Sequence, residues 1–402
     1  MTTSAPPSPA APGTGPFIPL CVPEIRGNEW AYVRECLDTG WVSSAGSFVE
    51  RFERELANEA GTAHAVATVN GTAALHIALL LAGVEPDDEV VVSALTFIAP
   101  ANAVRYAGAW PVFIDAEPDY FQMDVGRLRE FLRRDCEVRA GAVRNRATGR
   151  RVRALLPVHI LGHPVDMDPL LELAGDFGLA VVEDATESLG AHYRGRPVGG
   201  LGDIGCFSFN GNKLLTTGGG GMLVTNDASL AARARYLTTQ AKDDAVEYVH
   251  GAMGYNYRLT NLLAAMGSAQ LERCDAFLAA KRAIAARYQS AFTAVPGIRT
   301  MAEASWARSA WWMYTILLDE AECGMDSRAL MRALAAREIQ TRPLWQPLHR
   351  SPAHAGSPPA DCPVAERLNR MALSLPCSVG LDAASQDRVM AAVCEILDEA
   401  RR

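Results

Sequence analysis

The chain has 402 residues, 49% of them hydrophobic and 21% charged, so it can bury a large core and is long enough for two domains. Its 38 basic and 46 acidic residues leave a formal net charge of −8, and no run of basic residues offers the positive surface that nucleic acids or anionic membranes attract. Small disulfide-rich modules are excluded, and nucleic-acid and membrane partners are not expected.

Residues 1–16 are rich in Ser, Pro, Ala and Gly and lack the basic and apolar regions of a signal peptide. They are predicted to form a disordered tail. The nine cysteines are spread along the chain with no CxxC pair and no Cys/His cluster at zinc-ligand spacing. This pattern indicates reduced thiols in a cytoplasmic protein and predicts no metal site.

From residue 17 onward, the hydrophobic pattern predicts alternating helices and strands. The predicted helices of the first part span residues 47–59, 71–82 and 96–107. The predicted strands span residues 64–69, 89–93, 110–115, 152–158, 179–183, 206–209 and 221–224. Such alternation predicts a largely parallel sheet covered by helices on both faces.

A second, smaller α/β domain is predicted after a long linker helix over residues 260–294. Its predicted elements are a strand at 311–318, a helix at 327–336, a strand at 340–343 and a closing helix at 383–401. The predicted boundaries are 17–275 for the large domain and 276–402 for the small one.

Two residues point to a specific chemistry. Asp184 ends a hydrophobic strand, and ligands bind at the carboxyl ends of parallel strands. Lys213, one of only three lysines, lies in a loop with Gly and Asn. Pyridoxal phosphate (PLP) requires such a pair, the lysine for a Schiff base and the carboxylate to keep the pyridine nitrogen protonated. For an isolated Asp and Lys, a turn cap and a surface charge are the simpler interpretation, but the small residues around Lys213 favour an enclosed ligand.

A phosphate site is predicted at Gly71 and Thr72, which open a helix directly after a strand. Free backbone N–H groups, the helix dipole and a hydroxyl then converge on one point. An ordinary helix start is the simpler alternative. The four glycines at 218–221 do not match the dinucleotide fingerprint and are expected to allow close backbone approach instead.

The other two lysines are expected to be ordinary charged residues. Lys242 stands beside Asp243 and Asp244 in a polar loop, and Lys281 stands beside Arg282 on the long helix.

The chain resembles the DegT/DnrJ/StrS family of PLP-dependent nucleotide-sugar aminotransferases from about residue 18 to its C-terminus. The resemblance is carried by VNGTAALHIAL, ALTFIAPANAVRYAGAWPVFID, LPVHILGHPVDMD, EDATES, FSFNGNK, TTGGGGM and GYNYR, in this order. It implies the aspartate-aminotransferase fold (fold type I), an α/β fold with a mostly parallel seven-stranded sheet in the large domain and a smaller C-terminal α/β domain. It also implies a homodimer with shared active sites.

The resemblance assigns roles to individual residues. Lys213 would form the internal aldimine and move the proton between the amino donor and the cofactor, which cycles between PLP and pyridoxamine phosphate. Asp184 would hold the pyridinium, Phe97 would stack on the ring, and Glu187 would lie near the phenolic oxygen. Further phosphate ligands beside Gly71 and Thr72 would be Ser208 and Asn256, the latter from a second subunit.

Several positions depart from the common family pattern: Glu187 replaces Gln or His, and Asn210-Gly211-Asn212 replaces Tyr-Pro-Thr. With these variants, the chain looks like the branch that acts on UDP-linked 4-keto-6-deoxy-N-acetylhexosamines in legionaminic acid-type pathways. The expected substrate contacts are Trp41, Ser43, His163 and Arg258. Alternatives remain open for three residues: His163 as a structural histidine, Ser208 as a core hydroxyl, and Arg258 as a surface arginine.

The predicted reaction transfers an amino group, with L-glutamate as the expected donor, to a keto carbon of a nucleotide-linked deoxysugar. One alternative is a sugar dehydratase of the same fold, but there the lysine is replaced by histidine. Another alternative is a non-catalytic regulatory protein on this fold, which would lack the lysine, the ring aspartate or the phosphate helix. Lys213, Asp184 and the helix at Gly71 are all present.

Overall fold

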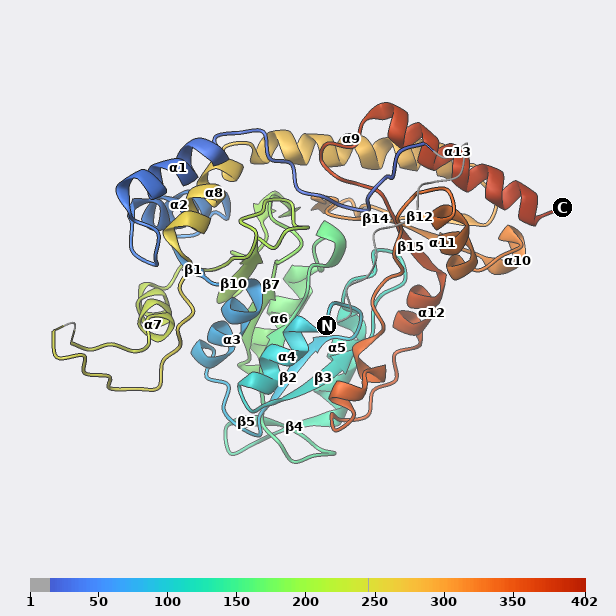
Figure 1. The fold of residues 1–402 in the computed structure, drawn as a ribbon. Coiled ribbons are helices and arrows are strands. Elements are labelled where there is room, and N and C mark those ends of the chain that lie inside the picture. Colours follow the sequence, from blue (N-terminus) through green and yellow to red (C-terminus); the bar gives the residue numbers. More distant parts are fainter. Residues whose placement is uncertain (1–14, 245) are drawn as a thin grey trace.

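The computed structural model describes residues 15–244 and 246–402, so the predicted tail at 1–16 lies outside the described residues except for its last two positions. A seven-stranded sheet and a separate three-stranded sheet organise the described chain (Figure 1). Within it, no helix is both long and apolar enough to cross a membrane.

The seven-stranded sheet contains all the strands predicted for the first part. Its order is β1 (His64–Thr68), β11 (Gly221–Thr225), β10 (Ile204–Ser208), β7 (Ala180–Asp184), β6 (Val152–Leu156), β2 (Glu89–Ser93) and β3 (Trp110–Ile114). Neighbours from β10 to β3 pair in parallel, whereas β11 is antiparallel to both β10 and β1. The predicted mostly parallel α/β fold is confirmed.

Strand residues of this sheet point alternately into two hydrophobic cores. In β2, Val90 and Val92 belong to one core and Val91 to the other, and in β7 Val182 and Val181 divide in the same way. Because both faces are covered, every position of these strands favours an apolar residue. This explains why they are recognisable as continuous apolar runs in the sequence.

Helices cover each face of the sheet (Figure 1). One core takes residues from α3 (Gly71–Leu81), α4 (Ala99–Tyr106) and α7 (Ala228–Thr238). The other core takes residues from α2 (Ser47–Glu59), α5 (Val125–Glu130), α6 (Met167–Phe177) and α8 (Asn261–Leu271). The predicted helix at 96–107 begins later, with Pro100 in its first turn, the position that a proline tolerates best.

The predicted helix at 260–294 is two helices, α8 and α9 (Cys274–Phe292), separated at Glu272 and Arg273. The Glu272 carboxylate accepts hydrogen bonds from Tyr32 at 2.6 Å and from Arg51 at 2.8 Å, which anchors this point to the preceding helices. Tyr32 lies on α1 (Glu29–Thr39), a helix that was not predicted from the sequence. The helical spacing of apolar residues continues across Glu272 and Arg273, so this spacing does not reveal the break between the two helices.

The three-stranded sheet has the order β12 (Ile298–Thr300), β14 (Tyr314–Leu318), β15 (Ala372–Leu375). The predicted strand at 340–343 is wrong: Arg342 makes only an isolated bridge to Ser374, and β15 supplies the third strand. The helices beside this sheet are α10 (Glu320–Cys323), α11 (Ser327–Ala335), α12 (Pro363–Met371) and α13 (Ala383–Ala400). Two further small sheets lie in the described chain. One has the order β13 (Ala307–Arg308), β8 (His192–Tyr193), β9 (Arg196–Pro197), and the other pairs β4 (Cys136–Arg139) with β5 (Ala142–Asn145).

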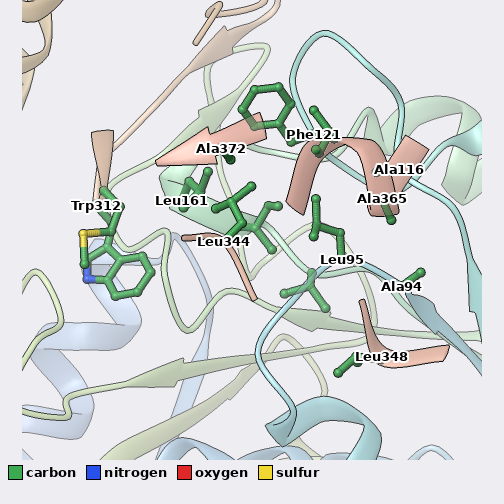
Figure 2. Close-up of a cluster of buried hydrophobic side chains, with 14 of the residues drawn as sticks. Ala94, Leu95, Ala116, Phe121, Leu161, Trp312, Leu344, Leu348, Ala365 and Ala372 are labelled. Atoms are coloured by element: carbon green, nitrogen blue, oxygen red, sulfur yellow. The ribbon is translucent and has the colours of Figure 1, made fainter. Parts of the chain in front are cut away.

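Helix α9 runs from α8 to the three-stranded sheet, and the predicted boundary at 275/276 falls at its start (Figure 1). The two parts also share apolar contacts. Figure 2 shows Leu95 and Leu161, from loops of the large sheet, beside Leu344 from the C-terminal part, and all three are buried. The edge of the large sheet where its parallel strands end is therefore partly covered by the C-terminal part.

Candidate active site

A pocket of about 380 Å³ opens where β7 and β10 end and α3 begins. Six of the predicted site residues line it: Gly71, Thr72, Phe97, Glu187, Ser208 and Lys213. Asp184, the last residue of β7, is buried beside them, and the Lys213 charge acts on its carboxyl. The structure thus gathers seven of the predicted residues from four separate stretches of the chain.

Asp184 is held rigidly. Its backbone N–H donates to the Pro157 carbonyl at 2.9 Å, and its carboxylate accepts the Thr186 backbone N–H at 3.1 Å. Burial raises the pKa of Asp184, while the bonds from Thr186 and the charge of Lys213 oppose this shift. A cation close to this carboxyl would favour its charged form further.

The residue before it, Glu183, stabilises the end of β7. Its carboxylate accepts the Nε2 proton of His159 at 3.0 Å and the backbone N–H groups of Gly199, Leu201 and Gly202. His159 is in that tautomer because its Nδ1 accepts the Val165 backbone N–H at 3.0 Å. These hydrogen bonds occupy both carboxylate oxygens of Glu183. Asp184 is therefore the carboxylate that remains beside the pocket.

Lys213 lies in the loop between β10 and β11, where its backbone N–H donates to the Asn210 carbonyl at 3.0 Å. Its Nζ is 3.5 Å from Oε1 of Glu187 and 4.2 Å from the centre of the Trp312 ring. The side chain is only 14% exposed. Lys213 is therefore neither a solvated surface charge nor tightly paired, since 3.5 Å is long for a charged hydrogen bond.

Glu187 lies buried on the other side of this amine. Its Oε2 accepts the Leu161 backbone N–H at 2.9 Å. Burial raises the pKa of Glu187 to about 7, although the positive charge of Lys213 and the Leu161 bond favour the ionised form. The carboxyl therefore changes charge near neutral pH, beside the lysine amine.

The beginning of α3 forms a cradle against the end of β10. Asn70 caps the helix by accepting the Ala73 N–H at 2.8 Å, and the first backbone N–H groups of a helix have no acceptor within it. A Cβ on Gly71 would lie 2.8 Å from the Cβ of Ser208, so only glycine allows this approach. A Cβ on Gly221, the last of the four glycines, would meet the Asn70 backbone at 2.5 Å, so close backbone approach is required there as expected.

Phe97 follows β2 and lines the pocket with 55% of its surface exposed. An aromatic ring this exposed at a pocket wall is available to stack on a flat ligand. Trp312 and Trp345 line the same pocket and were not identified as pocket residues from the sequence. Both come from the C-terminal part of the chain, and no spacing in the sequence relates them to Lys213.

Three predicted residues lie on the surface of the single chain and do not line the pocket. Trp41 is 60% exposed in the loop between α1 and α2, and Ser43 is exposed beside it. Asn256 is exposed before α8 and forms an isolated bridge with Thr239.

Two predicted substrate contacts have structural partners instead. Arg258 is almost buried, and its Nη1 donates to Glu53 at 2.7 Å and to the Ala67 carbonyl at 3.0 Å. His163 is fully buried, donates from Nδ1 to the Pro164 carbonyl and accepts the Ala304 N–H at Nε2. Both ring nitrogens of His163 are occupied, so the structure corrects its expected role as a sugar contact and supports the structural alternative. Nη1 of Arg258 is occupied by Glu53 and Ala67, and its expected substrate contact stays a prediction.

The structure also corrects the expectation for Lys281, which was predicted to be an ordinary charged residue of a long helix. It is only 2% exposed, and its Nζ donates to the Trp312 carbonyl at 2.8 Å. The helical pattern places it beside Arg282 but does not show what covers this face of α9.

Comparison with known proteins agrees with this geometry. A model of the DegT/DnrJ/EryC1/StrS aminotransferase family matches residues 23–394. The chain belongs to this family. It is 41% identical to GDP-perosamine synthase of Caulobacter vibrioides, with 95% of this chain and 99% of that protein covered. It is 37% identical to GDP-perosamine synthase of Escherichia coli O157:H7, with 95% and 98% covered.

Among solved structures, DesV of S. venezuelae in complex with a ketimine intermediate is similar, with a TM-score of 0.85 and 34% identity over 96% of this chain and all of that one (100%). The family confirms the predicted PLP-dependent nucleotide-sugar aminotransferase. Two of the relatives are named for a GDP-sugar, whereas the sequence variants predicted the UDP-hexosamine branch.

The residues present fit PLP. The cradle at Gly71 suits a phosphate, because a Cβ there would fill it. A buried carboxyl at Asp184 suits a protonated ring nitrogen. Lys213 supplies an amine without a close hydrogen-bond acceptor.

Proposed function

We propose that the chain transfers an amino group from L-glutamate to the keto carbon of a GDP-linked 4-keto-6-deoxysugar. The observation that carries this proposal is the amine of Lys213, held 3.5 Å from Glu187 in a pocket that also contains a buried aspartate and a helix N-terminus. PLP bound there supplies an electron sink that stabilises negative charge on the carbon next to the transferred nitrogen.

The roles of the chain's own residues follow from their positions. Thr72 and Ser208 line the cradle at the start of α3 and bind the phosphate, while Phe97 stacks on the ring. Asp184 holds a proton on the ring nitrogen, because its buried charge is most stable next to a cation. Trp312 and Trp345 limit the access of water to Lys213 from the side of the C-terminal part.

Lys213 Nζ is the group that takes and returns the proton on the reacting carbons. A general base must have its proton affinity near the working pH. Glu187 faces this amine, and its own carboxyl changes from neutral to charged as the pH rises through about 7. Glu187 therefore makes proton transfer at Lys213 dependent on pH in the neutral range.

The GDP-linked acceptor is supported by the relatives named GDP-perosamine synthase, which match nearly the whole chain. The UDP-linked 4-keto-6-deoxy-N-acetylhexosamine predicted from the motifs is the competing substrate. The test offers purified enzyme, PLP and glutamate the same keto sugar on GDP, UDP and TDP, together with the UDP-linked N-acetyl sugar. We expect the highest kcat/KM with the GDP sugar, and a preference for the UDP-linked N-acetyl sugar would overturn this assignment.

We also propose a homodimer in which each site is completed by the partner subunit. Asn256, Trp41 and Ser43 are exposed on the single chain, where they have no access to its own pocket. The segment that follows α7 extends away from the rest of the molecule (Figure 1) and carries Tyr248 at 67% and Met253 at 81% exposure. Large exposed apolar side chains of this kind favour a protein interface.

Subunit mixing tests the shared site. A Lys213→Ala chain and an Asn256→Ala chain, each inactive alone, should regenerate one intact site in a heterodimer. A mixture of the Lys213→Ala chain with a Lys242→Ala chain, which should be active alone, serves as the control for subunit exchange. Verified heterodimers that recover no activity, or an active monomer, would contradict the proposal.

The dehydratase alternative is disfavoured because Lys213 is present in the pocket, and the non-catalytic alternative because Asp184 and the start of α3 accompany it. We propose the cytoplasm as the location, since all nine cysteines are free thiols.

A further inference from the structure

Cys21, Cys377 and Lys281 form a buried cluster next to the Lys213 loop. The Nζ of Lys281 is 3.7 Å from the sulfur of Cys377 and 4.0 Å from the sulfur of Cys21. It also donates to the carbonyls of Trp312 and Cys377. Both thiols therefore face the same buried ammonium group.

Three distant segments of the chain meet in this cluster. Cys21 precedes α1, Lys281 lies on α9, and Cys377 follows β15. The backbone N–H of Cys377 donates to the Leu20 carbonyl at 2.8 Å, which holds the two cysteine-bearing segments side by side. Cys377 is 1% exposed and Cys21 is half-buried, so Cys21 is the side from which a small oxidant approaches.

The cluster is connected directly to the Lys213 loop. The Cys21 thiol donates to the Asn212 carbonyl at 3.4 Å, and the indole N–H of Trp312 donates to the same oxygen at 2.7 Å. Asn212 precedes Lys213, and the Trp312 ring lies under the Lys213 amine. A chemical change at the Cys21 sulfur therefore acts through one hydrogen bond on the Asn212 carbonyl, and Asn212 is joined directly to Lys213.

Cys377 differs in acidity from the other cysteines. The neighbouring Cys21 side chain and the charge of Lys281 lower the pKa of Cys377 to about 6, whereas the Cys377 side chain and burial raise the pKa of Cys21. Burial raises the pKa of each of the other seven cysteines. A thiolate with a second thiol beside it is the arrangement that reacts with peroxide.

We propose that Cys21 and Cys377 are a redox modification site, which hydrogen peroxide converts reversibly to a disulfide. The Cys377 thiolate attacks one peroxide oxygen, the O–O bond breaks, hydroxide leaves, and Cys377 becomes a sulfenic acid. The Cys21 sulfur then attacks the Cys377 sulfur: the S–S bond forms, the S–O bond breaks, and the departing hydroxide takes the Cys21 proton as water. Two electrons pass from the two sulfurs to one peroxide molecule.

Oxidation changes the Lys213 loop through a single atom. A disulfide sulfur has no hydrogen, so Cys21 no longer donates to the Asn212 carbonyl, and Trp312 is left as that oxygen's remaining donor of the two. We expect kcat to fall about fivefold, the order of effect of one lost hydrogen bond.

The test treats the full-length, PLP-loaded enzyme with hydrogen peroxide, blocks the remaining thiols and maps the peptides by mass spectrometry. A Cys21–Cys377 linked peptide should appear, kcat should fall, and dithiothreitol should reverse both. Cys394→Ser is the matched control, because Cys394 is also a half-buried free cysteine, but on α13. It should behave as wild type, while Cys21→Ser should form no linked peptide and keep its own untreated kcat.

The peptide map does not depend on the proposed substrate, so it separates this inference from the assignment of the reaction. Absence of the linked peptide from peroxide-treated enzyme with an unchanged melting curve would overturn the site. A linked peptide with unchanged kcat would overturn its connection to Lys213, as would equal loss of activity in Cys21→Ser.

Discussion

Two lysines that lie close to Trp312 have different surroundings. Lys213 lies in the loop between β10 and β11, and Lys281 lies on α9. Lys281 is 2% exposed and donates to the carbonyls of Trp312 and Cys377. Lys213 is 14% exposed, with a carboxylate oxygen at 3.5 Å and an aromatic ring at 4.2 Å. Trp312 lies between them, with its carbonyl on Lys281 and its ring under Lys213.

This difference shows what distinguishes a reactive amine from a structural one. An ammonium that donates to buried carbonyl oxygens is held in place, because its departure would leave those acceptors unpaired. An amine beside an aromatic ring, with its nearest carboxylate oxygen 3.5 Å away, is not fixed by close acceptors and can move toward a bound ligand. By donating to the Trp312 carbonyl, Lys281 helps to fix the residue whose ring contacts the Lys213 amine.

Replacing Lys213 is the strongest test of the comparison. Lys213→Ala should remove the visible absorbance of the PLP-loaded enzyme and lower kcat by more than about 10³-fold, because the nucleophile and proton carrier are lost. Its melting temperature should stay close to that of wild type. Lys242→Ala, in an exposed loop, is the control and should retain activity. Normal turnover by Lys213→Ala would relocate the site.

Asp184→Asn should come next in size. The amide keeps the shape but carries no charge to stabilise a protonated ring nitrogen, so kcat should fall by about 10²-fold or more. Steady-state kinetics with glutamate would measure this, with the absorbance spectrum showing whether PLP still binds. A loss smaller than that of Glu187→Gln would mean that Asp184 does not contact the ring.

Lys281→Met should affect stability more than chemistry. The carbonyls of Trp312 and Cys377 lose their donor, which should lower the free energy of unfolding by about 1–3 kcal/mol. Denaturant unfolding would measure it, with Lys242→Met as a matched control that should change little. If Lys281→Met instead removed all turnover from a protein of normal stability, the division between the two lysines would fail.

Glu187→Gln should have the smallest effect on the maximal rate and a clear effect on pH dependence. The pKa of Glu187 is raised to about 7, so the carboxyl is neutral below and charged above that pH, and the variant's rate profile should lose the inflection near neutrality. Because this pKa is raised on folding, wild-type stability should decline as pH rises from about 4.5 to 7, and the variant should show less decline. An unchanged profile would contradict the shift.

Much of the fold was predictable because the buried strands are visible in the sequence. Val90, Val91 and Val92 are all apolar because the sheet is covered on both faces. The break between α8 and α9 was not predictable, since it depends on Glu272 binding residues of α1 and α2. The strand at 340–343 failed because this segment makes only the isolated bridge from Arg342 to Ser374 of β15, and Pro343 has no backbone N–H with which to extend the pairing.

The candidate site also has residues that the sequence predicts and residues that it does not. Asp184, Lys213 and Gly71 were identifiable because each stands at a strand end, in the loop that follows a strand, or at a helix start, and the topology of a parallel sheet brings such positions together. Trp312 and Trp345 reach the pocket from loops of the C-terminal part, at a distance in sequence that no local pattern spans.

The sequence by itself therefore determined the family and indicated which residues form the candidate site, because both depend on residue type and local order. Only the tertiary structure decided the environment of each charge: the burial that raises the pKa of Glu187, the ion pair that occupies Arg258 and the carbonyls that hold Lys281. The physical reason is that solvation and hydrogen bonding depend on what covers a side chain, and the covering atoms come from segments far away in the chain.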